Sequence, residues 1–163
     1  MLTPTRLMPK ELKKLTKIEA RRTAAKKRQL VNDFNARWLA LKNDAVDQCA
    51  QGKSYVHCVY AVGMYVLIGL KALAQEGIAI SEAEPVDTLK VMRLALQDTA
   101  EAEALTYDLR CALMDGIEII EAATEQLSID AICDAWQYVD QGLRNGTLST
   151  TTMNQLIDNL QTQ

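Results

Sequence analysis

Only three prolines interrupt this chain of 163 residues, at Pro4, Pro9 and Pro85. Because proline removes a backbone donor and breaks helix interiors, the stretches 10–84 and 86–163 can form long helices on that criterion. In both stretches apolar residues recur every three or four positions, whereas the alternating pattern of a β-strand is scarce. The sequence therefore predicts an all-α fold, a helical bundle of five or six helices with a long basic N-terminal helix or arm.

The first predicted helix begins at Pro9, which suits a first helical turn, and runs to about Cys49. No large apolar residue occurs from Glu19 to Gln29, so this part must be solvated or must await a partner. The second half instead carries a core-facing seam in steps of three and four, made of Val31, Phe34, Trp38, Leu41 and Ala45. We therefore divide the chain into a basic arm, residues 1–30, and a helical bundle domain, residues 31–163.

The next segment is the most apolar of the chain. Ser54 is a good N-cap, the helical pattern runs to about Glu76, and Gly77 suits the residue that follows a helix. Its longest apolar run, Cys58–Leu70, has 13 residues, whereas a helix that crosses a bilayer needs about 20. We expect a buried central helix and no transmembrane segment.

The remaining helices are delimited by capping residues and by one ambiguous junction. The apolar positions from 89 to 127 fit either one helix of about 40 residues or two helices joined near 98–103, where the side chains turn small and acidic. Ser128 then suits an N-cap, and Asn145 with Gly146 predicts the turn that ends the next helix. A last short helix follows.

The net charge of −3 hides a strong asymmetry along the chain. Residues 1–42 hold 12 of the 18 Lys and Arg but only 3 of the 21 Asp and Glu. The net charge of residues 1–42 is therefore +9, and that of residues 43–163 is −12. Such a split is a hint of nucleic-acid or membrane contact at the basic end.

The basic residues of the arm form a stripe on a helix. Five of them, at positions 10, 14, 17, 21 and 28, fall within about 40° of one line at 100° per residue. A phosphate backbone needs such a row of cations, and binding of this kind is salt-sensitive and largely blind to sequence. The absence of interleaved aromatic residues argues against stacking on single strands. The candidate nucleic-acid-binding residues are Lys10, Lys13, Lys14, Lys17, Arg21, Arg22, Lys26, Lys27 and Arg28.

Other ligands suit the same stripe. An anionic membrane surface or an acidic protein groove would also be attracted to it. A solvated helical extension that charge keeps soluble would carry the same residues without any ligand. These alternatives stay open from the sequence.

A second charged face lies in the acidic part of the chain. Asp115, Glu118, Glu121 and Glu125 step by three, three and four, so they share one side of a helix. They could dock into a basic groove of a partner protein by imitating nucleic acid, or they could be the wet face of an amphipathic helix. Carboxylates on adjacent helices can also hold Mg²⁺, although only one imperfect ExxE motif occurs here.

No catalytic or cofactor motif is present. His57 is the only histidine, and its place on an apolar helix predicts a packed or capping role. Cys49, Cys58, Cys111 and Cys133 form no CxxC pair, so we predict reduced, buried thiols. A pairing of His57 with a cysteine in space stays open, and we expect no bound metal and no cofactor.

We therefore expect a cytoplasmic, non-enzymatic regulatory or accessory protein whose residues 10–28 bind nucleic acid or a nucleoprotein assembly. The alternative is a protein-targeting inhibitor or adaptor, which would use the acidic face within residues 98–125 against a basic partner protein. A hydrolase with a carboxylate-bound metal near residues 115–121 is a third reading. Amphipathic helices of this kind also pair between chains, so a homo-oligomer is left open.

Overall fold

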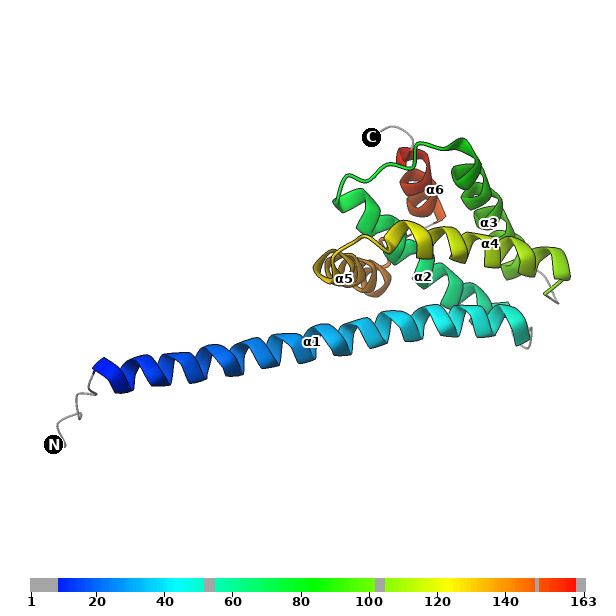
Figure 1. Ribbon diagram of the computed structural model, residues 1–163. Helices are drawn as coiled ribbons and strands as arrows, with labels where there is room; N and C mark the ends of the chain where they lie inside the picture. Colours follow the sequence, from blue (N-terminus) through cyan, green and yellow to red (C-terminus); the bar gives the residue numbers. More distant parts are fainter. Residues whose placement is uncertain (1–8, 52–54, 102–104, 149, 161–163) are drawn as a thin grey trace. The chain divides into compact units, whose positions relative to one another are not determined.

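The computed structural model describes residues 9–51, 55–101, 105–148 and 150–160, and every structural statement concerns these ranges. They contain six α-helices and no β-strand (Figure 1), so the predicted all-α class is confirmed. The helices in chain order are α1 (Pro9–Gln51), α2 (Tyr55–Gln75), α3 (Ala83–Glu101), α4 (Tyr107–Thr124), α5 (Ile129–Asn145) and α6 (Thr150–Asn159).

The chain divides into two compact units. The first is Met1–Ala36, which holds the first part of α1, and the second is Arg37–Gln163, which holds the rest of α1 and the other five helices. The two units are described separately. The functional division that the sequence places after residue 30 stays a prediction.

The first unit is helical because its composition favours a helix without a core. Alanine, lysine and arginine have high intrinsic helix propensity, and they make up most of residues 20–28. Every described side chain from Thr16 to Leu30 is exposed, including the apolar Ile18 and Leu30 at either side of the stretch that has no large apolar residue. Val31 and Phe34 are half-buried.

Several predicted helix ends are confirmed in the second unit. Ser128 caps α5, with its hydroxyl accepting a hydrogen bond from the Ala131 N–H at 3.2 Å. Gly77 and Gly146 follow α2 and α5 in the left-handed region, each with a φ of 66° that glycine adopts without strain. The ambiguous apolar stretch forms two helices, and Thr106 caps the second of them. The predicted break after Gln51 lies outside the described residues.

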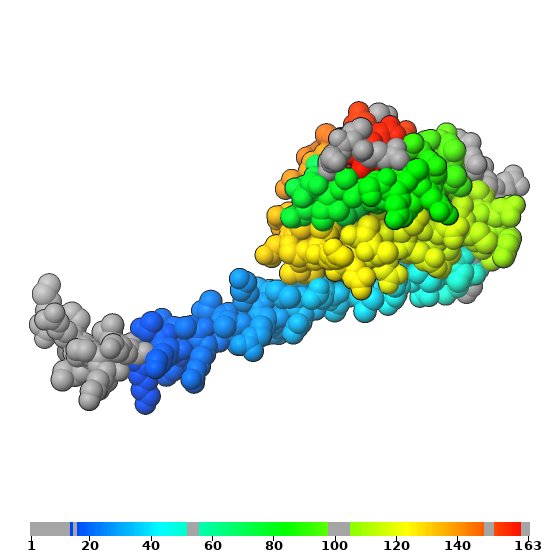
Figure 2. Space-filling view, turned by 45° about the horizontal axis from the view of Figure 1, so that its top comes forward, coloured from blue at the N-terminus to red at the C-terminus, as the bar shows by residue number. Residues whose placement is uncertain are grey.

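The central position predicted for α2 is confirmed. This helix packs against α3, α4, α5 and α6, and α3 also packs against α4 and α6. Figure 2 shows α3, in green, beside α4, in yellow-green, across one face of the second unit. Because α2 has neighbours on several sides, its nearly continuous apolar surface is covered.

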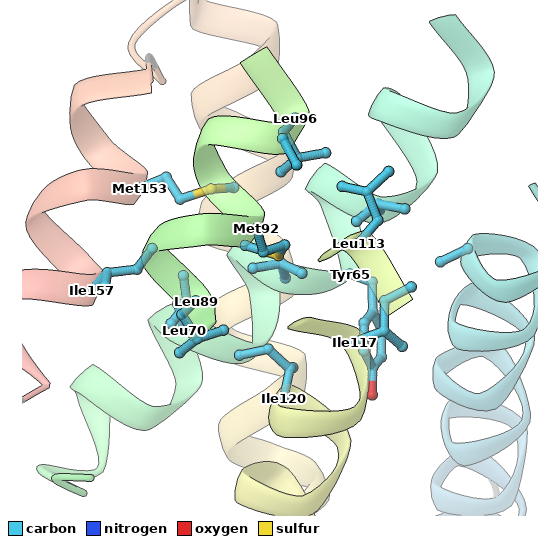
Figure 3. Packing of buried hydrophobic residues seen from close by; sticks show 14 of the residues in the cluster. Tyr65, Leu70, Leu89, Met92, Leu96, Leu113, Ile117, Ile120, Met153 and Ile157 are labelled. Carbon is cyan, nitrogen blue, oxygen red and sulfur yellow. The ribbon is translucent and has the colours of Figure 1, made fainter. Parts of the chain in front are cut away.

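The core of the second unit is built from large apolar side chains on these five helices. Met92 of α3 lies among Leu89, Leu113 and Ile117, and Met153 of α6 points toward α3 (Figure 3). Burying each such side chain stabilises the fold by about 1.5 to 3 kcal/mol. The fully buried side chains include Tyr65, Ile68, Leu70, Leu73, Leu89, Met92, Leu113, Ile117, Ile120, Ile157 and Leu160.

Two features show how closely these helices are joined. Gly116 of α4 lies against Met92 of α3, and a Cβ added at Gly116 would be 2.8 Å from the Met92 Cβ. The Ile80 N–H, in the connection between α2 and α3, donates to the Leu160 carbonyl at 3.1 Å, which ties that connection to the end of α6. The close contact between α3 and α4 therefore requires a glycine at position 116, and the end of α6 is held by the connection between α2 and α3.

One described segment, Val56–Gln75, is long and apolar enough to cross a membrane by length and composition. It is longer than the apolar run Cys58–Leu70 because it also includes the residues on either side of that run. Core helices meet the same criterion, and most of this segment is buried against its neighbours within the protein.

Candidate functional site

The basic stripe lies in the first unit, on α1. The described cations at positions 14, 17, 21, 22, 26, 27 and 28 all have exposed side chains. Lys10 and Lys13 belong to α1, but their side chains lie outside the described residues. The described part of the stripe is therefore open to a ligand along its whole length.

The charge density of this stripe is high. Seven cations and one acid, Glu19, occur from Lys14 to Arg28, a length of about 21 Å at a rise of 1.5 Å per residue. That is one cation per about 3 Å, close to the spacing of about 3.4 Å of helix axis per phosphate on one strand of DNA. Charge of this density attracts a polyanion over several contacts at once.

The cations do not all lie on one side of the helix. At 100° per residue, Lys14, Lys17, Arg21 and Arg28 fall within one sector of about 60°, whereas Arg22, Lys26 and Lys27 lie more than about 75° outside it. Small residues occupy much of the remaining surface, namely Thr16, Ala20, Thr23 and Ala24. Lys27 lies among these short side chains, so cations project from the helix in several directions.

Within the described part of the chain, one ion pair is formed, between Lys42 Nζ and Glu121 Oε1 at 2.6 Å. Both residues belong to the second unit. None of the seven described arm cations is thus neutralised by an intramolecular ion pair in the described ranges. Their charge is available to a partner.

The acidic face predicted from the sequence falls on α4 and its C-cap. Asp115, Glu118 and Glu125 are exposed, and Glu121, half of whose side chain is exposed, is held by Lys42. The four residues therefore share a side of α4, but one of them already has a cationic partner. Among the described residues, no group of three or more His, Cys, Asp or Glu is arranged to hold a metal ion.

Three aromatic side chains of the second unit form a cluster. Trp38 stacks on Tyr65 with ring centroids 4.6 Å apart, and Trp136 meets Trp38 edge-on at 6.2 Å. Burial, reinforced by the negative charge of Glu121, raises the pKa of Tyr65 above its ordinary value. This cluster joins α1, α2 and α5, so both tryptophans pack at seam positions as predicted.

Two of the four cysteines are in contact. The Sγ atoms of Cys49 in α1 and Cys58 in α2 lie 3.8 Å apart, and both residues are fully buried. Cys111 and Cys133 are only half-buried, so the expectation of four buried thiols is wrong for these two. Their positions on the half-exposed sides of α4 and α5 explain the difference.

The Cys49–Cys58 contact was not anticipated from the sequence. A signal for it exists, because Cys49 continues the apolar seam of α1 by one further step of four, and Cys58 opens the apolar run of α2. His57, between this run and the start of α2, is exposed, so the predicted packed role is wrong, and the predicted capping role stays a prediction.

The comparisons with known proteins identify no relative: no family model matches this chain, and neither a curated protein nor a solved structure gives a significant match. The function of this protein must therefore be inferred from its residues and their arrangement.

Proposed function

We propose that this chain is a small, non-enzymatic regulatory or accessory protein whose basic N-terminal helix, residues 10–28, binds nucleic acid, alone or within a nucleoprotein assembly. In this proposal residues 31–163 form a helical bundle that carries the arm, and the protein acts in the cytoplasm without a membrane span. The observation that supports the proposal is the run of seven exposed, unpaired cations on the described part of the helix.

The ligand that fits this arrangement best is a duplex. An α-helix with its side chains is about 10 to 12 Å across, and the major groove of B-DNA is about 12 Å wide. Because the cations project in several directions around the helix, they can reach the phosphates on both walls of such a groove. Single strands are bound with the help of aromatic stacking, and residues 14–30 contain no aromatic residue.

The test is a fluorescence titration of the full chain against a labelled DNA duplex over a range of salt concentrations. A triple variant, Lys17→Gln, Arg21→Gln and Arg28→Gln, removes three of the four cations that share one sector of the helix. Each lost phosphate contact makes the negative slope of log K against log salt shallower by about 0.9, so we expect the magnitude of the slope to decrease by about 2.7. Binding at low salt should weaken strongly.

A matched control removes the same charge from the second unit. Its substitutions are Lys90→Gln, Arg93→Gln and Arg144→Gln, and we expect the duplex affinity to stay close to that of the unchanged protein. Two results would contradict the proposal. One is the absence of binding at low salt, and the other is an equal loss of affinity in both triple variants.

We keep the inhibitor or adaptor as a second candidate because Asp115, Glu118 and Glu125 present exposed carboxylates on one side of α4. It predicts a complex with a basic protein that survives nuclease treatment and weakens when these three residues become Asn or Gln. Loss of the complex on nuclease treatment alone would favour the first candidate.

A further inference from the structure

We propose that Cys49 and Cys58 form an oxidation site, at which hydrogen peroxide or an organic hydroperoxide converts the two thiols into an intramolecular disulfide. The bond would join the last turn of α1 to the first turn of α2. This site is independent of the basic stripe and of the function proposed for it.

The geometry of the pair carries the proposal. Their Sγ atoms lie 3.8 Å apart, and a disulfide bond measures about 2.05 Å, so the sulfurs must approach by less than about 2 Å. The two residues sit on consecutive helices, with α1 ending at Gln51 and α2 beginning at Tyr55. Among the four cysteines, these two are the pair in contact, and Cys111 and Cys133 are the more exposed ones.

Burial of the pair does not prevent oxidation, because both thiols lie next to helix ends. Terminal turns open more readily than helix interiors, since fewer backbone hydrogen bonds must break. The neighbouring Gln51, Val56 and His57 are exposed. A small peroxide can therefore reach the sulfurs through a local opening, whereas a bulky oxidant is excluded.

A nearby cation favours the reactive form of the pair. Arg110 of α4 has a buried Nε with no hydrogen-bond partner among the described residues. The hydrogen bond between the two thiols lowers the pKa of Cys58 and outweighs its burial, and the positive charge of Arg110 lowers that pKa further. The same hydrogen bond, together with burial, raises the pKa of Cys49. Cys58 is therefore the better nucleophile, because the thiolate is the attacking species.

The reaction balances in two steps. The Cys58 thiolate attacks one peroxide oxygen, the O–O bond breaks, and a sulfenic acid forms while the leaving oxygen takes up a proton as water or alcohol. Cys49 then attacks the Cys58 sulfur, the S–O bond breaks, and a second oxygen leaves as water. Two thiols lose two hydrogen atoms in total, and one peroxide is reduced.

The decisive experiment uses a full-length variant with Cys111→Ser and Cys133→Ser, in which the pair is the only source of thiols. The reduced protein is treated with hydrogen peroxide, denatured and alkylated, and its peptides are mapped by mass spectrometry. We expect a monomer that has lost two hydrogen atoms, a linked peptide pair containing Cys49 and Cys58, and recovery of both thiols on reduction. Full alkylation of both residues after treatment, or disulfides formed only between chains, would overturn the proposal.

A second variant tests the part played by Arg110. Arg110→Gln removes the charge but keeps a polar side chain, and each pKa unit that the charge supplies changes the thiolate fraction about tenfold. We expect disulfide formation to slow by up to about tenfold at neutral pH, and to recover as the pH is raised. An unchanged rate at neutral pH would contradict the role of Arg110. The oxidation site itself is tested separately, by the peptide mapping of the Cys49–Cys58 disulfide.

Discussion

The indole ring of Trp38 stacks on the phenol ring of Tyr65, with an angle of 28° between the ring planes. This contact joins the part of α1 that belongs to the second unit to the central helix α2. Aromatic pairs of this kind contribute about 0.5 to 1.5 kcal/mol beyond the area that they bury. Trp136 adds an edge contact from α5, so three helices meet at Trp38.

Replacing Trp38 by alanine removes both ring contacts and leaves a gap beside Tyr65. We expect the free energy of unfolding to fall by about 3 kcal/mol, measured by urea denaturation. Leu39→Ala is the matched control, because Leu39 is 55% exposed on the same helix, and its effect should stay within about 0.5 kcal/mol. Similar losses in both variants would show that the stacked pair contributes little.

Gly116 offers a test of the α3–α4 contact. In Gly116→Ala the new Cβ would crowd Met92, so we expect a loss of about 1 to 3 kcal/mol in thermal or urea unfolding. Gly63, inside α2, has nothing within 4 Å of an added Cβ, and Gly63→Ala should stabilise the protein by about 0.5 to 1 kcal/mol. Opposite signs for the two substitutions are the expected result, and a stabilising Gly116→Ala would contradict it.

The stability of the second unit should decline in alkaline solution because of Tyr65. Its pKa is raised in the folded state, whereas the unfolded side chain loses its proton near pH 10. Above that pH the unfolded state binds fewer protons than the folded state, so the free energy of unfolding falls as the pH rises, by up to about 1.4 kcal/mol per unit.

Tyr65→Phe should flatten this alkaline decline in urea titrations at several pH values. The exposed Tyr60 supplies the control, because Tyr60→Phe leaves the buried hydroxyl in place and should keep the decline as steep as before. An equally steep decline in Tyr65→Phe would assign the effect to other groups.

The helical form of the arm can be tested apart from its charge. Ala24→Pro interrupts α1 in the first unit, where proline costs about 3 kcal/mol in a helix interior. We therefore expect the helical circular dichroism signal and duplex binding to fall. The melting temperature of the second unit should not change, because the described side chains from Thr16 to Leu30 contribute none of the buried core. Ala24→Gln is the control that retains the helix, and unchanged binding in Ala24→Pro would indicate that the cations act without a helix.

Helix ends could be predicted from the sequence because single residues determine them. Ser128 offers a hydroxyl to an unpaired N–H, and Gly77 and Gly146 accept a backbone conformation that other residues avoid. The all-α class followed from spacing that repeats over many residues. The sequence does not decide whether α3 and α4 are separate helices, because apolar spacing continues across their junction and only local composition marks the break.

Contacts between helices could not be predicted in the same way. The meeting of Cys49 with Cys58, and of Lys42 with Glu121, depends on how helices are rotated against each other, which no local pattern records. The half-burial of Cys111 also depends on how α4 is rotated against its neighbours. The basic stripe was visible at once, since exposure on a helix with nothing to bury follows from composition alone.

The hydrogen bond from Ile80 to Leu160 has a consequence for synthesis. The core includes Met153, Ile157 and Leu160, so it is complete only after the ribosome has released α6. At about 5 to 20 residues per second, the apolar helix α2 waits roughly 4 to 17 seconds between its own synthesis and the arrival of residue 160. During that interval the nascent chain exposes the apolar surface of α2. The speed of translation therefore affects how much of the protein avoids aggregation.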